Sequence, residues 1–414
     1  MHQGTSEVKK ISRAEKKERR RAIKQNRNGS GLNSPKLSSG MEFKPANLLK
    51  GCDFLVILLI VLLSLFGVAM VFSAGYYETI NSSDPDPTFY LFRQLMWVGL
   101  GLVLMTIFAN IDYHLFLKIS GIIIAVSIIL LVLVMAVGST VNNAQRWLYI
   151  GGIGITPSEF SKLAVIIFTS CFLAKNPDNI KSFGGILILL AIMAVHFILI
   201  YKQPNLSTAI VIVAIMGAIM LVGGLNIPIT LISGTALAFA GYKYIMKFNS
   251  STHWYKRLTS FTDPFKDMQG DGYQVSQGLI ALGNGGLKGL GFGRSIAKNL
   301  YLPEPQNDFI LAIIGEELGY LGFLLLMLVY IILLFKLMMI ALNAPDRLGF
   351  YLVTGVAVML GLQVIINVAV VTSSMPATGI TLPFISYGGT SILSFMMSMG
   401  IVLNVSRKRK AESS

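Results

Sequence analysis

Long runs of apolar residues recur along this chain and are separated by short polar segments. Each run has about 20 residues, the length of an α-helix that crosses the hydrocarbon core of a bilayer. The pattern predicts an all-α polytopic membrane protein with about ten transmembrane helices. The predicted helices start near Asp53, Phe89, Leu117, Thr156, Phe183, Ser207, Pro228, Phe309, Gly349 and Leu382.

Positive charge is concentrated at the two ends of the chain and sets the predicted orientation. Of the 34 Lys and Arg residues, 13 lie within residues 1–50, and "SRKRK" lies near the C-terminus. Lys and Arg are enriched on the cytoplasmic side, and an even number of spans puts both termini on one side. We therefore expect a basic cytoplasmic arm (1–50), a ten-helix membrane domain (51–406) and a basic cytoplasmic tail (407–414).

Two segments on the predicted outer face are too long to be simple turns. One is "NNAQRWLYIGGIGITPSEFSK", between the third and fourth predicted helices, and the other is a large extracytoplasmic loop over residues 249–308, between helices 7 and 8. Loops of such length are usually functional or disordered, and the aromatic and charged residues of the loop over residues 249–308 favour a folded segment. Within it we expect a flexible "GNGGLKGLGFG" and an accessible Ser251 and Lys298.

Composition and residue spacing give no support for nucleic-acid binding, a disulfide or a metal site. The chain has 414 residues, of which 54% are hydrophobic and 13% charged, and a mean hydropathy of +0.67. The net charge of +14 does not indicate nucleic-acid binding, because most of it lies in the arm and the tail. The two cysteines are far apart and are expected to pack rather than to form a disulfide, and the four histidines have no metal-ligand spacing.

Ionisable residues within or beside the predicted helices are costly to bury, so each needs a role. Glu159 and Lys162 are three residues apart and lie on one helical face. They form either a structural ion pair or the polar floor of a site for an anionic head group, with Lys162 supplying charge and Glu159 orienting it. Arg146 is either an interfacial anchor or a contact to phosphate, because a guanidinium matches phosphate oxygens.

Asp308 precedes the eighth predicted helix and has two possible roles. Asp is a preferred N-cap residue, and a helix that starts at Phe309 would place it there. The alternative is a catalytic carboxylate, for which a helix end is a rigid mount. Further along the same helix, Glu316 and Glu317 are adjacent and point about 100° apart. We expect them to be buried and hydrogen-bonded or to line a wet cavity, not to act as a paired acid and base.

Four separated blocks of sequence together resemble the SEDS family (shape, elongation, division and sporulation). They are "RWLYIGGIGITPSEFSKLAVI", "DPFKDMQGDGYQVSQGLIALGNGGLKGLGFG", "YLPEPQNDFILAIIGEELGYLG" and "MPATGITLPFISYGGTS". "GVAMVFSA" and the third block look most like the division branch, and the sporulation and elongation branches stay open. The resemblance implies a ten-helix membrane fold in the bacterial cytoplasmic membrane, and the division branch implies the division septum.

The resemblance also implies an activity. Members of the family polymerise lipid II, an undecaprenyl-pyrophosphate disaccharide-pentapeptide, into β-1,4 glycan on the outer membrane face. They are peptidoglycan glycosyltransferases that work with a class B penicillin-binding protein and, in division, with other divisome proteins. The family's catalytic aspartate lies in an H-T-D-F block, which corresponds to Gln306-Asn307-Asp308-Phe309 here, so only its first two residues differ. Other departures are Asn205, Ser207, Thr156 and Thr378.

The site residues that follow from these patterns have distinct expected roles. We expect Asp308 to be the general base, with Arg146 and Lys162 on the phosphate side and Glu159 and Glu304 as further substrate-binding residues. The sequence shows no metal site, and a divalent Mg²⁺ or Mn²⁺ remains open. The alternatives are a lipid II flippase or transporter and a non-catalytic scaffold of the division machinery. Polar residues clustered at the outer helix ends favour the enzyme.

Overall fold

The fold is described from a computed structural model of the chain. The arm (1–50), the seventh predicted helix near Pro228 and much of the first half of the large loop, including Ser251, lie outside the described residues. The described residues are 51–81, 85–141, 144–151, 153–225, 243, 261, 263–266, 270 and 272–412.

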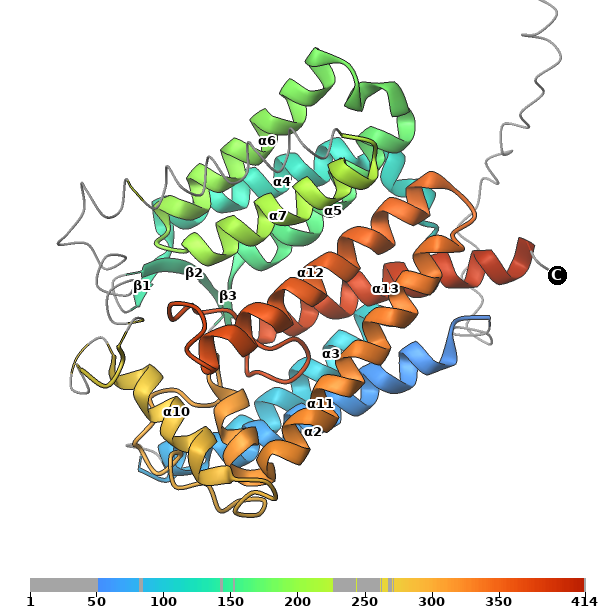
Figure 1. Cartoon of the computed structure of the whole chain (residues 1–414). Coiled ribbons are helices and arrows are strands. Elements are labelled where there is room, and N and C mark those ends of the chain that lie inside the picture. The colour runs from blue at the N-terminus through green and yellow to red at the C-terminus, as the bar shows by residue number, and fades with distance from the viewer. Residues whose placement is uncertain are drawn as a thin grey trace, which may run out of the picture. The chain divides into compact units, whose positions relative to one another are not determined.

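Helices make up nearly all of the described chain (Figure 1). Eight of them are long and apolar enough to span a membrane, and α7 is a shorter apolar helix, which confirms the predicted all-α membrane fold. The helices are α2 (Phe54–Ile80), α3 (Phe89–Asn110), α4 (Phe116–Val137), α5 (Pro157–Lys175), α6 (Phe183–Lys202), α7 (Leu206–Val222), α10 (Tyr273–Gly285), α11 (Ile310–Leu342), α12 (Arg347–Val371) and α13 (Gly389–Glu412). Short 3-10 helices lie at Tyr113–Leu115 and Pro177–Ile180.

Burial separates central helices from peripheral ones. Over an 18-residue apolar stretch, 89% of α13 and 72% of α5 are buried, against 22% of α6. A helix that is apolar on all sides yet exposed in the folded chain fits a bilayer environment, where its outer face meets lipid. The exposed Leu, Ile and Phe residues of α6 and α11 are therefore expected to face hydrocarbon.

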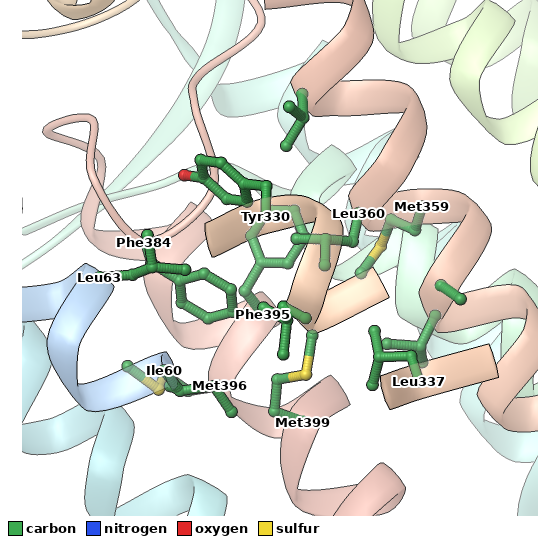
Figure 2. Close-up of a cluster of buried hydrophobic side chains, with 14 of the residues drawn as sticks. Ile60, Leu63, Tyr330, Leu337, Met359, Leu360, Phe384, Phe395, Met396 and Met399 are labelled. Carbon is green, nitrogen blue, oxygen red and sulfur yellow. The ribbon is translucent and has the colours of Figure 1, made fainter. Parts of the chain in front are cut away.

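The main core joins α2, α11, α12 and α13 (Figure 2). Tyr330 of α11 and Phe395 of α13 are fully buried side chains of this core, and both lie beside Phe384. The Tyr330 hydroxyl donates to the carbonyl oxygen of Pro383 at 2.5 Å, which satisfies its polar end within an apolar cluster. A second, smaller core lies among α4, α5, α6 and α7.

The last predicted helix starts later than expected. Residues 372–388 are irregular, and α13 begins at Gly389 rather than near Leu382. Pro383 lacks an N–H for a helix, and Phe384 has a left-handed φ of 65°, so this apolar stretch does not continue as helix. Leu382, Phe384 and Ile385 are nevertheless buried, because irregular backbone at membrane depth is tolerated where protein covers it.

The segment between α4 and α5 folds into a small antiparallel sheet that the all-α prediction missed. Its strands β1 (Ser139–Val141), β2 (Ala144–Ile150) and β3 (Ile153–Ile155) pair in the order β1-β2-β3. Strands this short carry too little periodic signal to be separated from a loop by sequence.

Alternation of the helices gathers their ends into two groups (Figure 1). We call the first group the Asp308 end. It holds the sheet, the start of α11, the end of α12 and the segment 372–388. The opposite group, the C-terminal end, holds the links between α3 and α4 and between α11 and α12 together with the last turns of α13. Because α13 continues to Glu412, the first residues of the predicted tail (407–414) are helical.

Candidate functional site

Asp308 lies just before α11 and is half-buried. The helix begins at Ile310, and Phe309 occupies the N-cap position with φ −103° and ψ 15°. Of the two roles left open for Asp308, the N-cap role is therefore not the one observed, because the helix starts one residue later than predicted. The backbone oxygen of Asp308 accepts a hydrogen bond at 2.8 Å from the side-chain amide of Asn367, a residue of α12.

Asn367 connects Asp308 to the segment 372–388. The same amide group donates to the backbone oxygen of Ile380 at 2.9 Å, so one side chain holds the two segments together. Asn367 is 1% exposed within a mostly apolar helix. A polar residue in a predicted span is a recognisable signal, and we did not single out Asn367 by it.

Arg146 reaches the same segment from β2. Its Nε donates to the backbone oxygen of Gln203 at 3.1 Å, and its Nη2 donates to that of Pro204. Its Nη1 lies 3.7 Å from the position of a Cβ built on Gly379, next to Ile380. Arg146 from β2 and Asn367 from α12 therefore both reach the segment 372–388, and Asn367 links this segment to Asp308. Whether Arg146 also binds phosphate stays a prediction.

Glu159 and Lys162 form the predicted ion pair in the first turns of α5. The Lys162 Nζ lies 2.9 Å from Glu159 Oε2, and the two side chains are only 4% and 15% exposed. The ammonium also lies 5.8 Å from the ring centre of Phe395, and Ser394 donates to the backbone oxygen of Glu159 at 2.9 Å. The pair thus ties α5 to α13. The predicted ion pair is confirmed, and the substrate-binding role of both residues stays a prediction.

Glu304 is exposed and forms a tight turn before Asp308. Its φ is 45°, and both the backbone N–H and the side-chain amide of Asn307 donate to it, at 3.1 and 2.9 Å. A left-handed non-glycine residue stores strain and persists only where its surroundings hold it. Glu304 therefore helps to define the path of the chain into Asp308, and contact with substrate stays a prediction for it.

Glu316 and Glu317 are fully buried and hydrogen-bonded, as expected. Glu317 Oε1 pairs with Lys298 Nζ at 2.9 Å and accepts from the hydroxyl of Ser73 in α2 at 2.7 Å. Glu316 Oε2 accepts from the hydroxyl of Ser295 and from the backbone N–H of Ala297. Lys298 is only 4% exposed, so the expectation that it is accessible from outside is wrong. Sequence gave no reason to pair it with Glu317.

The glycine-rich stretch that we expected to be flexible is hydrogen-bonded into a break in α11. Gly319 has φ 69° and ψ −170°, which interrupts the helical hydrogen bonds. Leu290 and Gly291 donate to the backbone oxygens of Glu316 and Glu317 at 3.0 and 2.9 Å, and Tyr320 donates to that of Gly286 at 2.9 Å. These bonds replace the missing helical ones, and therefore "GNGGLKGLGFG" is part of the folded structure.

Within the described residues, no group of three or more His, Cys, Asp and Glu side chains comes together as a metal site would require. We therefore derive no step through a metal ion, and the open Mg²⁺ or Mn²⁺ of the sequence analysis stays untested.

Comparison with known proteins agrees with this architecture. Residues 53–411 match the cell cycle protein family that comprises FtsW, RodA and SpoVE. The chain is 40% identical to the stage V sporulation protein E of Bacillus subtilis (strain 168), over 86% of this chain and 97% of that protein. It is 33% identical to the probable peptidoglycan glycosyltransferase FtsW of Geobacter sp. (strain M18), over 87% and 98%.

Solved structures show the same fold. The rod shape determining protein RodA of Thermus thermophilus matches with a TM-score of 0.64 and 26% identity, over 86% of this chain and 97% of that one. A chain of a peptidoglycan synthase complex, which coordinates polymerization and crosslinking, matches with a TM-score of 0.72 and 26% identity, over 86% and 98%. The chain therefore belongs to the FtsW/RodA/SpoVE family of cell cycle proteins, the SEDS family whose motifs it carries.

Proposed function

We propose that this chain is a peptidoglycan glycosyltransferase that polymerises lipid II into β-1,4 glycan, with Asp308 as the general base. The family assignment supports the reaction, because curated relatives across most of the chain are named peptidoglycan glycosyltransferases. The observation that carries the residue assignment is the position of Asp308. It is a half-buried carboxylate at a helix end, and Asn367, which holds its backbone, also holds Ile380, next to Gly379 and Arg146.

The reaction requires a base and a stabilised leaving group. A sugar hydroxyl of one chain attacks the anomeric carbon of the other, the bond from that carbon to the pyrophosphate oxygen breaks, and the hydroxyl proton passes to Asp308. The departing diphosphate carries the displaced electron pair and needs positive charge nearby. Arg146 is suited to this task because a guanidinium matches phosphate oxygens, whereas the charge of Lys162 is already neutralised by Glu159.

The partner and the location follow from the family. A structural neighbour is a chain of a complex that couples polymerization to crosslinking, which supports a class B penicillin-binding protein as the partner of this chain. We further propose that both termini are cytoplasmic and that the Asp308 end faces outward, since the basic arm and tail belong on the inner side. Similarity to both a sporulation protein and FtsW proteins supports the septum of division or of sporulation as the site of action.

Purified chain, incubated with lipid II with and without its partner, tests the proposal. Asp308→Asn keeps the size and hydrogen-bonding oxygen of the side chain but removes the base, so polymer formation should fall about 10²–10⁴-fold while expression stays normal. Asp86→Asn is the matched control, since it makes the same change at an exposed aspartate just before α3, and it should retain most activity.

The same assay separates the alternatives. Polymer made by Asp308→Asn at the wild-type rate would move the base elsewhere, with Glu304 the first residue to examine. Movement of labelled lipid II across vesicles without any polymer would support the flippase instead.

A further inference from the structure

The residue two positions before Asp308 takes part in a closed ring of hydrogen bonds. Gln306 is 2% exposed, and its side-chain amide donates to Glu78 Oε2 at 2.7 Å and to the hydroxyl of Tyr90 at 3.0 Å. The Tyr90 hydroxyl donates in turn to Glu78 Oε1 at 3.1 Å. We name these three residues the Glu78 clamp.

The clamp joins the Asp308 segment to two helices. Glu78 lies in the last turn of α2 and Tyr90 in the first turn of α3, whereas Gln306 belongs to the chain that leads into α11. The backbone oxygen of Gln306 accepts from the N–H of Tyr387 at 2.9 Å, and the rings of Tyr90 and Tyr387 meet edge to face at 4.9 Å. The backbone at Gln306 is therefore fixed from three sides.

Donor and acceptor roles in the ring allow little freedom. Both amide protons of Gln306 and the hydroxyl proton of Tyr90 are used, and the Glu78 carboxylate accepts from both partners. A hydrogen bond to a charged acceptor is stronger than one between neutral groups. An ionised Glu78 therefore determines which way the amide of Gln306 points, and exchange of its oxygen and nitrogen would place two acceptors together.

Asp308 is held equally on its other side. Asn367 donates to its backbone oxygen at 2.8 Å, so the chain is fixed by Gln306 two residues before Asp308 and by Asn367 at Asp308 itself. General-base catalysis depends on such placement, because displacement of a catalytic group by about 1 Å can cost about 10²-fold in rate.

We propose that Glu78 is a positioning residue that acts through Gln306 to place the Asp308 carboxylate against the attacking hydroxyl. The inference rests on the proposed function, since it assigns a partner to the proposed base. Glu78 needs no contact with substrate for this role. Its effect should therefore appear in kcat, with KM for lipid II unchanged.

An exchange of the two polar partners tests the inference. Gln306→Glu sets a second carboxylate against Glu78, so kcat at neutral pH should fall at least about tenfold. Lowering the pH should recover part of the loss, because one shared proton allows the two acids to hydrogen-bond. The double variant Glu78→Gln with Gln306→Glu restores an amide–carboxylate bond in the opposite direction and should recover kcat to within about threefold of wild type.

Two controls keep the result specific. Each variant is compared at equal amounts of folded protein, judged by melting temperature and gel filtration in detergent. Tyr90→Phe removes one bond of the ring while keeping its packing on Tyr387, and should lower kcat only a few-fold.

Asp308→Asn is assayed in parallel so that the two proposals fail separately. If Asp308→Asn is inactive but the double variant is no better than Gln306→Glu, the positioning role is wrong and the base assignment stands. The same conclusion follows if Gln306→Glu alters only stability or KM. If Asp308→Asn polymerises at the wild-type rate, the base assignment fails and the positioning role fails with it.

Discussion

The start of α5 and the break in α11 each hold a buried pair of an ammonium and a carboxylate, yet the two pairs are built differently. Lys162 and Glu159 lie three residues apart in one helix, with 4% and 15% of their side chains exposed. Lys298 and Glu317 lie 19 residues apart, with 3% and 0% exposed. Both pairs have the same separation of 2.9 Å between nitrogen and oxygen.

The difference determines what each pair does for the fold. A pair three residues apart can form in any helix of this sequence, so it adds little information about tertiary structure. The Lys298–Glu317 pair forms only when the glycine-rich segment docks into the break of α11 and α2 supplies Ser73. The pair therefore acts as a lock, in the sense that it holds together the segment of Lys298, α11 and α2. Its loss should lower the stability of the whole Asp308 end.

The comparison predicts its largest effect at Lys298. Lys298→Met leaves the carboxylate of Glu317 buried without its cation, which typically costs about 3–5 kcal/mol. Thermal unfolding in detergent and the yield of monodisperse protein should both fall sharply. The double variant with Glu317→Leu removes both charges and should recover much of the loss.

Lys288→Met is the matched control. Lys288 lies in the glycine-rich segment ahead of Lys298 and is exposed, so its loss should be nearly neutral. Equal stability of Lys298→Met and Lys288→Met would show that the buried pair is not a lock.

A second prediction concerns the space that docking requires. Gly289 and Gly293 have φ of 78° and 77°, but a Cβ on Gly289 would collide with the backbone oxygen of Glu317, whereas one on Gly293 would meet nothing within 4 Å. Gly293→Ala should cost only the strain of a left-handed residue, about 1–2 kcal/mol. Gly289→Ala adds the collision, so its melting temperature should be clearly lower. Equal melting temperatures would mean that the segment does not dock as described.

The local pair should show a smaller effect. Lys162→Met leaves Glu159 partly exposed and in the first turn of α5, where the helix dipole favours an acid, so we expect a loss of about 1–3 kcal/mol. Reversal of the pair should restore part of the stability and of the polymerisation rate. If both single variants and the reversal fold normally but are equally inactive, Lys162 contacts substrate charge and is not mainly structural.

The contrast between the pairs also explains what sequence could predict. Apolar runs locate most helices within a few residues, because a bilayer demands about 20 apolar residues whatever the tertiary contacts. The Glu159–Lys162 pair was predictable from its spacing, and Asp308 from the resemblance to the SEDS family. Each of these signals is contained in one short stretch of chain.

What sequence could not predict depends on residues far apart in the chain. Glu78 and Gln306 are 228 positions apart, and Asn367 is 59 positions from Asp308. The irregular path of residues 372–388 depends likewise on burial beneath other helices, since apolar composition alone favoured a helix from Leu382.

The smallest effect is expected at the C-terminal end, where a third charged network is more exposed than either pair. Asp112 pairs with Lys408 of α13 at 2.5 Å and with His114 at 2.8 Å, and His114 bonds Asp346 at 2.6 Å. Hydrogen bonds from His114 and Lys408 lower the pKa of Asp112 despite partial burial. For Asp346, burial raises the pKa, but the bonds from His114, Gly349 and Tyr113 outweigh it and lower the pKa overall.

A carboxylate whose pKa is lower in the folded state stabilises the fold above its unfolded pKa, about 3.9 for Asp, and loses this contribution as the pH falls through the folded pKa. The melting temperature should therefore decrease when the pH is lowered below about 4. Part of that decrease should be absent in a variant with Asp112→Asn and Asp346→Asn. Because side chains that are 32% to 55% exposed are screened by solvent, the difference should be small and should shrink further in high salt. An acid-induced fall of the same size in the double variant would show that this network, unlike the two buried pairs, contributes nothing to stability.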